Sequence, residues 1–133
     1  MRKIEHIGIA VKDIKKSNEL FAKLFGKEHY KVEEVASEGV STSFFQMGDT
    51  KIELLEAASE DSAIAKFIEK RGEGIHHIAF KVDDIHSEMQ RMVDEGFTLI
   101  NKEPKRGADN MMVCFLHPKS TNGVLVELCQ EIS

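Results

Sequence analysis

Apolar residues recur along the chain with two different spacings, and the order of these spacings is the same in both halves. Alternation of apolar and polar residues predicts β-strands, whereas apolar residues three and four positions apart predict helices. In the first half, the predicted order is one strand, one helix and three strands, over residues 4–11, 15–25, 31–35, 40–47 and 51–56. In the second half, the same order runs over residues 75–82, about 85–95, 97–101, 111–116 and 123–129. A short helix over residues 62–71 joins the halves, so each half is predicted to be a βαβββ unit.

The first predicted strand has two different faces. Side chains alternate along a strand, so Ile7, Ile9 and Val11 share one face. His6 lies on the other face, which it shares with the small residues at positions 8 and 10. We therefore expect one face to pack under a helix and the other to leave room for a ligand beside the histidine.

The two longer helices are each predicted to pack one apolar stripe against the sheet. The stripe residues are Leu20, Phe21, Leu24 and Phe25 in the first helix and Met89, Met92 and Val93 in the second. Gly26 and Gly96 follow these helices and are expected to end them, because glycine readily adopts the conformation that follows a last helical turn.

The two halves share residues as well as patterns. HIGIAVKDI at residues 6–14 returns as HIAFKVDDI at residues 77–85, with five identical positions. KIELLE at residues 51–56 is answered by LVELCQ at residues 125–130, with a glutamate in third place in both. Each half therefore carries one histidine at a strand start and one glutamate in a late strand, namely His6 and Glu53, then His77 and Glu127.

These four residues together indicate a metal site, although each alone has an ordinary structural explanation. Glu127 stands within an apolar strand, where a carboxylate must be paired, neutralised or bound to metal. Two histidines and two glutamates suit a divalent ion such as cobalt, manganese, nickel, zinc or iron(II). His76 adjoins His77 but points to the opposite face of the strand, so His77 is the preferred ligand.

Composition narrows the class of protein. The chain has 133 residues, of which 41% are hydrophobic and 31% charged, as in a soluble globular domain. A net charge of −5 disfavours binding to nucleic acid. No apolar run approaches the ~18 residues of a membrane span, and the first residues lack the apolar centre of a secretion signal. We expect a cytoplasmic protein that does not bind membranes, with Cys114 and Cys129 as free, buried thiols.

Four stretches resemble a known family. They are HIGIAVKDI at residues 6–14, GDTKIELLE at 48–56, DSAIAKFIEKRGEGIHHIAFKVDDI at 61–85 and HPKSTNGVLVEL at 117–128. On these stretches the chain resembles the vicinal oxygen chelate superfamily (glyoxalase/bleomycin resistance/dioxygenase), and within it the methylmalonyl-CoA epimerases. The likeness runs from about residue 4 to residue 130.

The resemblance implies both a fold and a metal site. The fold is α+β, a single domain over residues 1–133. In it, two paired βαβββ modules, about residues 4–57 and 74–131, form a cupped, partly closed mixed sheet around the metal. His6, Glu53, His77 and Glu127 fall on the four metal positions of the family. The implied cofactor is one divalent ion, cobalt or manganese by preference, with nickel or zinc as alternatives.

The resemblance also implies a reaction. It is the interconversion of the R and S forms of methylmalonyl-CoA through a metal-stabilised enolate, with Glu127 as one acid/base group. Some family members carry a second catalytic glutamate after a Gly-Val pair, and the matching place here is near Thr42. A hydroxyl is too weak a base unaided, so the second proton carrier stays open among Glu53, Glu38 and a water held by Thr42.

The implied partners are an acyl-CoA substrate and a second copy of the chain. The CoA tail is expected near the loops at residues 102–110 and 117–122, where Lys105, Arg106 and Lys119 could meet its phosphates unless they are ordinary solvated charges. Apolar residues of strand 40–47 could form part of a homodimer interface, unless they pack in the core. These residues are Phe44, Phe45 and Met47.

Three other functions compete with the epimerase. A glyoxalase I of the same superfamily uses a similar ligand set, but carries an arginine-bearing pattern where this chain has Ile9 to Lys12. Metal-free drug-sequestering proteins of the same fold lose the ligands that this chain keeps. An extradiol dioxygenase would need only His6, His77 and Glu127 around iron and would have no use for Glu53.

Overall fold

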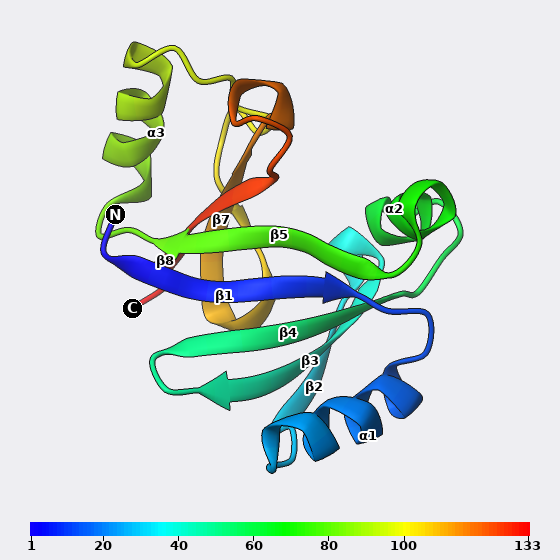
Figure 1. Cartoon of the computed structure of the whole chain (residues 1–133). Helices are drawn as coiled ribbons and strands as arrows, with labels where there is room; N and C mark the ends of the chain where they lie inside the picture. Colours follow the sequence, from blue (N-terminus) through cyan, green and yellow to red (C-terminus); the bar gives the residue numbers. More distant parts are fainter. The chain divides into compact units, whose positions relative to one another are not determined.

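The computed structural model describes all 133 residues and has the element order expected from the sequence (Figure 1). The first part comprises β1 (Lys3–Ala10), α1 (Ile14–Phe25), β2 (Lys31–Val35), β3 (Val40–Met47), β4 (Thr50–Ala57) and α2 (Ala63–Arg71). The second part comprises β5 (Gly74–Lys81), α3 (Ile85–Asp94), β6 (Lys105–Arg106), β7 (Met111–Leu116) and β8 (Val126–Glu131). The predicted α+β class and the βαβββ order are confirmed. No helix has the length and apolar character that crossing a bilayer requires.

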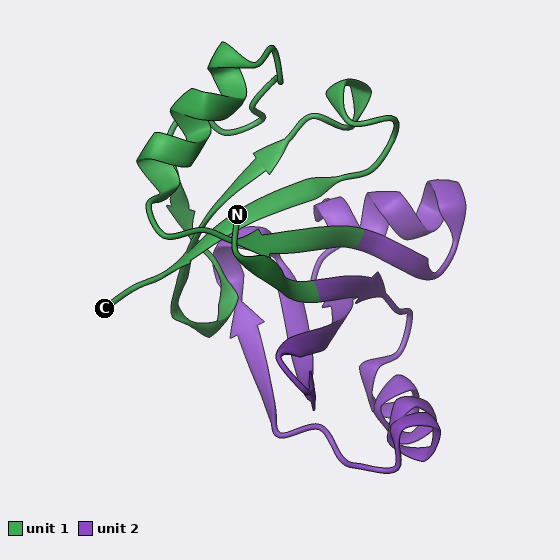
Figure 2. Cartoon of the chain, turned by 60° about the vertical axis from the view of Figure 1, so that its left-hand side comes forward, with its two compact units in different colours: residues 1–6, 77–133 green, residues 7–76 purple.

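The chain forms two compact units, one of residues 7–76 and one of residues 1–6 with 77–133 (Figure 2). Hydrogen-bonded strands follow the order β2-β3-β4-β1-β5-β8-β7-β6, and β1 and β5 contribute residues to both units. β2, β3 and β4 pair antiparallel, whereas β5 pairs parallel with β8 and β8 pairs antiparallel with β7. The sheet is therefore mixed. The assignment of residues 4–57 and 74–131 to two modules stays a prediction.

In the unit of residues 7–76, α1 begins and ends as its sequence predicts. The Asp13 side chain accepts a hydrogen bond from the Lys16 backbone N–H, which satisfies a donor at the helix start. Gly26 closes the helix in the left-handed conformation, with φ 72°. Phe21 and Phe25 pack with the buried residue Phe45 in one core cluster, which also contains Ile9 of β1 and Val11 just after this strand.

Half of the predicted apolar stripe of α1 is exposed, which corrects the prediction. Leu20 and Leu24 are 62% and 69% exposed, whereas Phe21 and Phe25 face the core. Adjacent helical residues differ by about 100° around the axis, so a helix that buries Phe21 and Phe25 turns Leu20 and Leu24 away. Val93 of α3 is half exposed for the same reason, because its neighbour Met92 faces the core.

In the unit of residues 1–6 and 77–133, α3 packs against one apolar cluster. Asp84 caps the helix by accepting a hydrogen bond from the Ser87 backbone N–H. Met89 and Met92 are buried, as predicted. Their cluster also contains Val82, Ile85, Cys114, Leu116 and Leu128. Both cysteines are buried and free, which confirms their predicted state.

The predicted strand at residues 97–101 is wrong. Only an isolated bridge between Leu99 and Leu116 forms there, and the strand that pairs with β7 on the side away from β8 is the two-residue β6. The Asn101 side chain accepts the Phe115 backbone N–H at 2.8 Å, so a side chain occupies a donor that a strand carbonyl would have used. β8 also starts later than predicted, at Val126, because turn hydrogen bonds involve the preceding residues, among them Gly123 N–H to the Pro118 carbonyl.

The apolar residues of β3 are mostly core residues. Phe44 and Phe45 have no exposed surface, and Met47 at the strand end is 37% exposed. The proposed contribution of Phe44 and Phe45 to a homodimer interface is therefore wrong, and the alternative of core packing holds. Phe45 belongs to the cluster under α1, which leaves it no surface to offer a partner.

Candidate metal centre

Three of the four predicted ligands converge in the unit of residues 1–6 and 77–133. His6 Nε2 lies 3.0 Å from His77 Nε2. Glu127 Oε1 lies 3.1 Å from His77 Nε2 and 3.6 Å from His6 Nε2. Each of the three residues is 5% exposed. Two imidazole nitrogens and one carboxylate oxygen therefore meet at a single buried point.

Strand pairing brings these residues together. His6 is on β1, His77 on β5 and Glu127 on β8, which are consecutive strands in the sheet. The parallel register sets Glu127 opposite Ala79, and the antiparallel register sets it opposite Phe115. Residues two apart share a strand face, so His77 lies on the same face as Ala79, whose methyl group leaves space for the Glu127 carboxylate. The convergence follows from register between residues far apart in sequence.

The two histidine rings meet through their edges. Their centroids lie 5.1 Å apart with an interplanar angle of 89°. The Phe115 ring approaches His77 from β7, with centroids 5.7 Å apart and an angle of 81°. These contacts restrict ring rotation and keep both Nε2 atoms directed at the same point.

The Glu127 carboxyl group is the most perturbed acid of the site. Burial by itself raises its pKa. The charges on His6 and His77 and the hydrogen bonds that they donate outweigh burial and hold the pKa well below its usual range. Glu127 is therefore ionised at neutral pH. An ionised, buried carboxylate beside two imidazoles attracts a positive charge.

This donor set fits a divalent metal ion. Imidazole nitrogen and carboxylate oxygen are the ligands that borderline divalent ions prefer. Two ligands held at right angles at about 2.1 Å from a metal are roughly 3.0 Å apart. The separations of 3.0, 3.1 and 3.6 Å between the three donor atoms agree with one face of such a coordination shell. His6, His77 and Glu127 could hold the ion.

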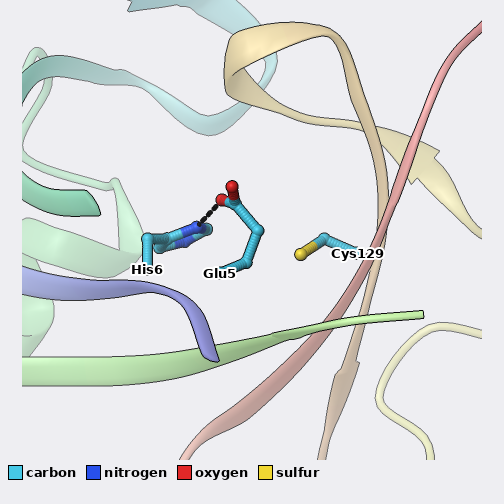
Figure 3. A group of neighbouring side chains, drawn as sticks. All are labelled: Glu5, His6 and Cys129. Carbon is cyan, nitrogen blue, oxygen red and sulfur yellow. Dashed lines mark hydrogen bonds and ion pairs between the residues drawn. The ribbon is translucent and has the colours of Figure 1, made fainter. Parts of the chain in front are cut away.

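Glu5 is a polar neighbour of the site that the sequence analysis did not identify. Its carboxylate Oε1 contacts His6 Nδ1 at 2.7 Å, and Glu5 itself is 4% exposed (Figure 3). Cys129 lies nearby, and one donor atom each of Glu5, His6 and Cys129 falls within 4.8 Å of the others. The available signal was a glutamate directly before the repeated histidine, in a strand with few other charges.

The fourth predicted ligand lies in the other unit. Glu53 is on β4, opposite Phe44 in the antiparallel register, and is 4% exposed. Its membership of the metal site stays a prediction. His76, the rejected alternative to His77, packs its ring against Phe67, with centroids 5.0 Å apart.

The remaining candidates are spread over both units. Thr42, on β3, is 1% exposed, and Glu38 lies in the single turn before β3. Lys105 and Arg106 form β6, and Lys119 lies in the turn that follows β7. Arg106 donates a hydrogen bond to the Asn110 side chain at 3.1 Å, which ties part of its guanidinium to the protein itself.

Known proteins resemble this chain over nearly its whole length. The family model of the glyoxalase/bleomycin resistance protein/dioxygenase superfamily matches residues 5–115. Mitochondrial methylmalonyl-CoA epimerase of Dictyostelium discoideum is 41% identical over 127 residues, 95% of this chain and 76% of that protein. The ethylmalonyl-CoA/methylmalonyl-CoA epimerase of Cereibacter sphaeroides is 39% identical over 130 residues, which cover 96% of this chain and 97% of that protein. A variant of Streptomyces coelicolor methylmalonyl-CoA epimerase, solved with 2-nitronate-propionyl-CoA, has a TM-score of 0.93 at 34% identity, covering 100% of this chain and 96% of that one.

Proposed function

The chain belongs to the glyoxalase/bleomycin resistance protein/dioxygenase superfamily, and we propose that it is a divalent-metal-dependent epimerase that interconverts the R and S forms of methylmalonyl-CoA. The observation that carries the proposal is the convergence of His6, His77 and Glu127 at one buried point, in a chain that has methylmalonyl-CoA epimerases among its relatives. These relatives are isomerases. The metal, the residue roles and the substrate of this chain are our proposal.

The reaction requires a proton to leave the carbon between a thioester and a carboxylate and to return on the other face. Glu127 is the proposed acceptor on one face, because its carboxylate is ionised and can therefore accept a proton. His6 and His77 keep that carboxylate ionised and, together with it, would hold the ion. A divalent ion at this point would supply positive charge to the oxygen that becomes negative when the proton leaves.

The proposed ligand set also includes Glu53, which would complete the two-His, two-Glu arrangement. Its place in the repeat, equivalent to that of Glu127, supports the proposal. Cobalt or manganese is the proposed ion, and nickel or zinc would suit the same donors. The acyl-CoA tail is proposed to reach Lys105, Arg106 and Lys119, and the homodimer stays a prediction.

The most direct test is racemisation of one methylmalonyl-CoA enantiomer by the purified protein with added cobalt or manganese. We expect the optical activity to decay only when the ion is present, and EDTA to stop the decay. Turnover of methylglyoxal with glutathione, without racemisation, would identify a glyoxalase instead. If the protein shows neither reaction and its melting temperature does not change with EDTA, it would be a drug-sequestering protein.

Thr42 tests where the second proton carrier lies. We expect Thr42→Ala to reduce racemisation less than about tenfold, because a lost hydroxyl leaves a water or a carboxylate such as Glu53 or Glu38 to carry the proton. The measurement is the initial rate of racemisation at saturating substrate. Ser41→Ala, one position along the same strand, is the matched control for loss of a hydroxyl. A loss above about 100-fold in Thr42→Ala alone would place the Thr42 hydroxyl in the proton transfer itself.

A further inference from the structure

We propose that Glu5 is a positioning residue. It keeps the ring proton of His6 on Nδ1 and so leaves the Nε2 lone pair directed at His77 and Glu127. The inference deepens the proposed function, because it rests on the metal centre described above. It concerns a residue that makes no direct contribution to the proposed ligand set.

The contact between Glu5 and His6 has the geometry of a short, charge-assisted hydrogen bond. The Glu5 carboxylate oxygen and His6 Nδ1 are 2.7 Å apart, within the 2.7–2.9 Å typical of such bonds. We assign this bond to a carboxylate acceptor, which places its proton on Nδ1, because an ionised carboxylate can only accept. A neutral imidazole carries one N–H, and its Nε2 is then an unprotonated donor atom suited to a metal.

The two nitrogens of His6 have separate partners. Nδ1 meets Glu5, whereas Nε2 lies 3.0 Å from His77 Nε2 and 3.6 Å from the Glu127 carboxylate. Figure 3 shows the Glu5 carboxylate directed at the edge of the His6 ring, and the Cys129 thiol on the other side of Glu5. The ring is thus held from one side and presents its other nitrogen to the metal position.

Burial makes this arrangement effective. Glu5 is 4% and His6 5% exposed, so water competes little for the bond between them. Consecutive strand residues normally point to opposite faces, and the Glu5 side chain reaches the ring although it directly precedes His6 on β1. Burying a carboxylate costs free energy. A carboxylate beside a histidine ring commonly orients that ring as a metal ligand, and this role accounts for a buried glutamate at position 5.

The tautomer can be measured without any metal. We expect long-range ¹H–¹⁵N spectra of the metal-free protein, at a pH where the ring is neutral, to show His6 protonated at Nδ1 and unprotonated at Nε2. The opposite tautomer in the wild-type protein would overturn the proposal. Because this readout needs neither metal nor substrate, it separates the role of Glu5 from the proposed enzymatic function.

Two variants of Glu5 test the consequence for metal binding. Glu5→Leu removes the acceptor, and we expect the dissociation constant for cobalt, measured by titration calorimetry, to rise about 10- to 100-fold. Glu5→Gln keeps a carbonyl acceptor for Nδ1–H and should recover most of this loss. Glu103→Leu, at an exposed position of the same unit, controls for the loss of one negative charge.

The outcomes separate two failures. A wild-type protein that does not bind cobalt would overturn the metal centre, and the ¹⁵N spectra would still decide the His6 tautomer. A wild-type protein that binds cobalt, with Glu5→Leu binding equally well, would overturn the positioning role alone. If Glu5→Leu does not fold, the test rests on Glu5→Gln. The proposal then requires that Glu5→Gln has the same His6 tautomer populations as the wild type and retains its affinity for cobalt.

Discussion

Replacement of Glu127 with glutamine is expected to lower the exchange of the substrate α-proton in deuterated water by at least about 100-fold, the low end of what a positioned general base contributes. The Glu127 carboxylate is ionised because two imidazoles hold its pKa below the usual range. An amide in the same place keeps the shape of the side chain but cannot accept a proton. Deuterium incorporation followed by mass spectrometry measures the loss directly, independently of the configuration of the product.

The same substitution must be separated from an effect on the metal, because Glu127 is also a proposed ligand. The amide oxygen of glutamine can still coordinate an ion, so cobalt binding should weaken without disappearing. The exchange assay is therefore run with cobalt in excess of the dissociation constant measured for the variant. Wild-type exchange under these conditions would remove Glu127 from the proton transfer and leave it, at most, as a ligand.

His77→Ala is expected to abolish stabilisation of the protein by divalent metal. An ion present at 100 times its dissociation constant stabilises the folded state by about 2.7 kcal/mol. For a chain of 133 residues this corresponds to a rise in melting temperature of roughly 10 °C. Loss of one imidazole from a set of three converging donors leaves His6 and Glu127 with an incomplete site. Thermal unfolding with and without cobalt measures the difference.

His86→Ala is the matched control for this experiment. His86 is exposed on the first turn of α3 and lies outside the three-residue cluster, so its loss should leave the cobalt-induced rise intact. The metal-free melting temperatures of both variants report any damage to the fold itself. An undiminished cobalt response in His77→Ala would show that the ion binds elsewhere and that the His6, His77 and Glu127 cluster is not the metal centre.

Most of the fold could be read from local patterns. The bounds of β2, β3 and β7 agree with the expected ranges, and the bounds of α1 and α3 agree to within one residue. Alternation and helical spacing report backbone geometry over a few residues, which is why they locate elements well. The errors in strand bounds fell at residues 97–101 and 123–125, where a hydrogen bond to the Asn101 side chain and turn hydrogen bonds such as Gly123 N–H to the Pro118 carbonyl interrupt regular strand pairing.

The repeat was the most informative part of the sequence for the site. It singled out His6 and His77 from the six histidines of the chain, and it paired them with glutamates at equivalent positions. The structure brings His6, His77 and Glu127 together and keeps His76 against Phe67 instead. Repetition can identify such residues because equivalent positions in two copies of a motif occupy equivalent places in two copies of a fold.

The repeat gave no such indication for Glu5. Its counterpart in the second half is His76, so the repeat gives it no carboxylate partner, and strand alternation assigns it to the face opposite His6. Only the side-chain conformation in the folded chain reveals the 2.7 Å contact with Nδ1. The exposed pair Leu20 and Leu24 is a similar case, because the wide apolar stripe of α1 left open which of its edges would face the core.

Chain pattern and motif repetition were thus sufficient for the order of elements, the α+β class and the identity of the candidate ligands. The meeting of the His6 and His77 nitrogens, 71 positions apart in sequence, needed the pairing of β1, β5 and β8. The ionised state of Glu127 and the contact that orients His6 also depend on the tertiary structure. Local preferences act over a few residues, whereas distances between side chains, their burial and their mutual charges exist only once strands distant in sequence are aligned.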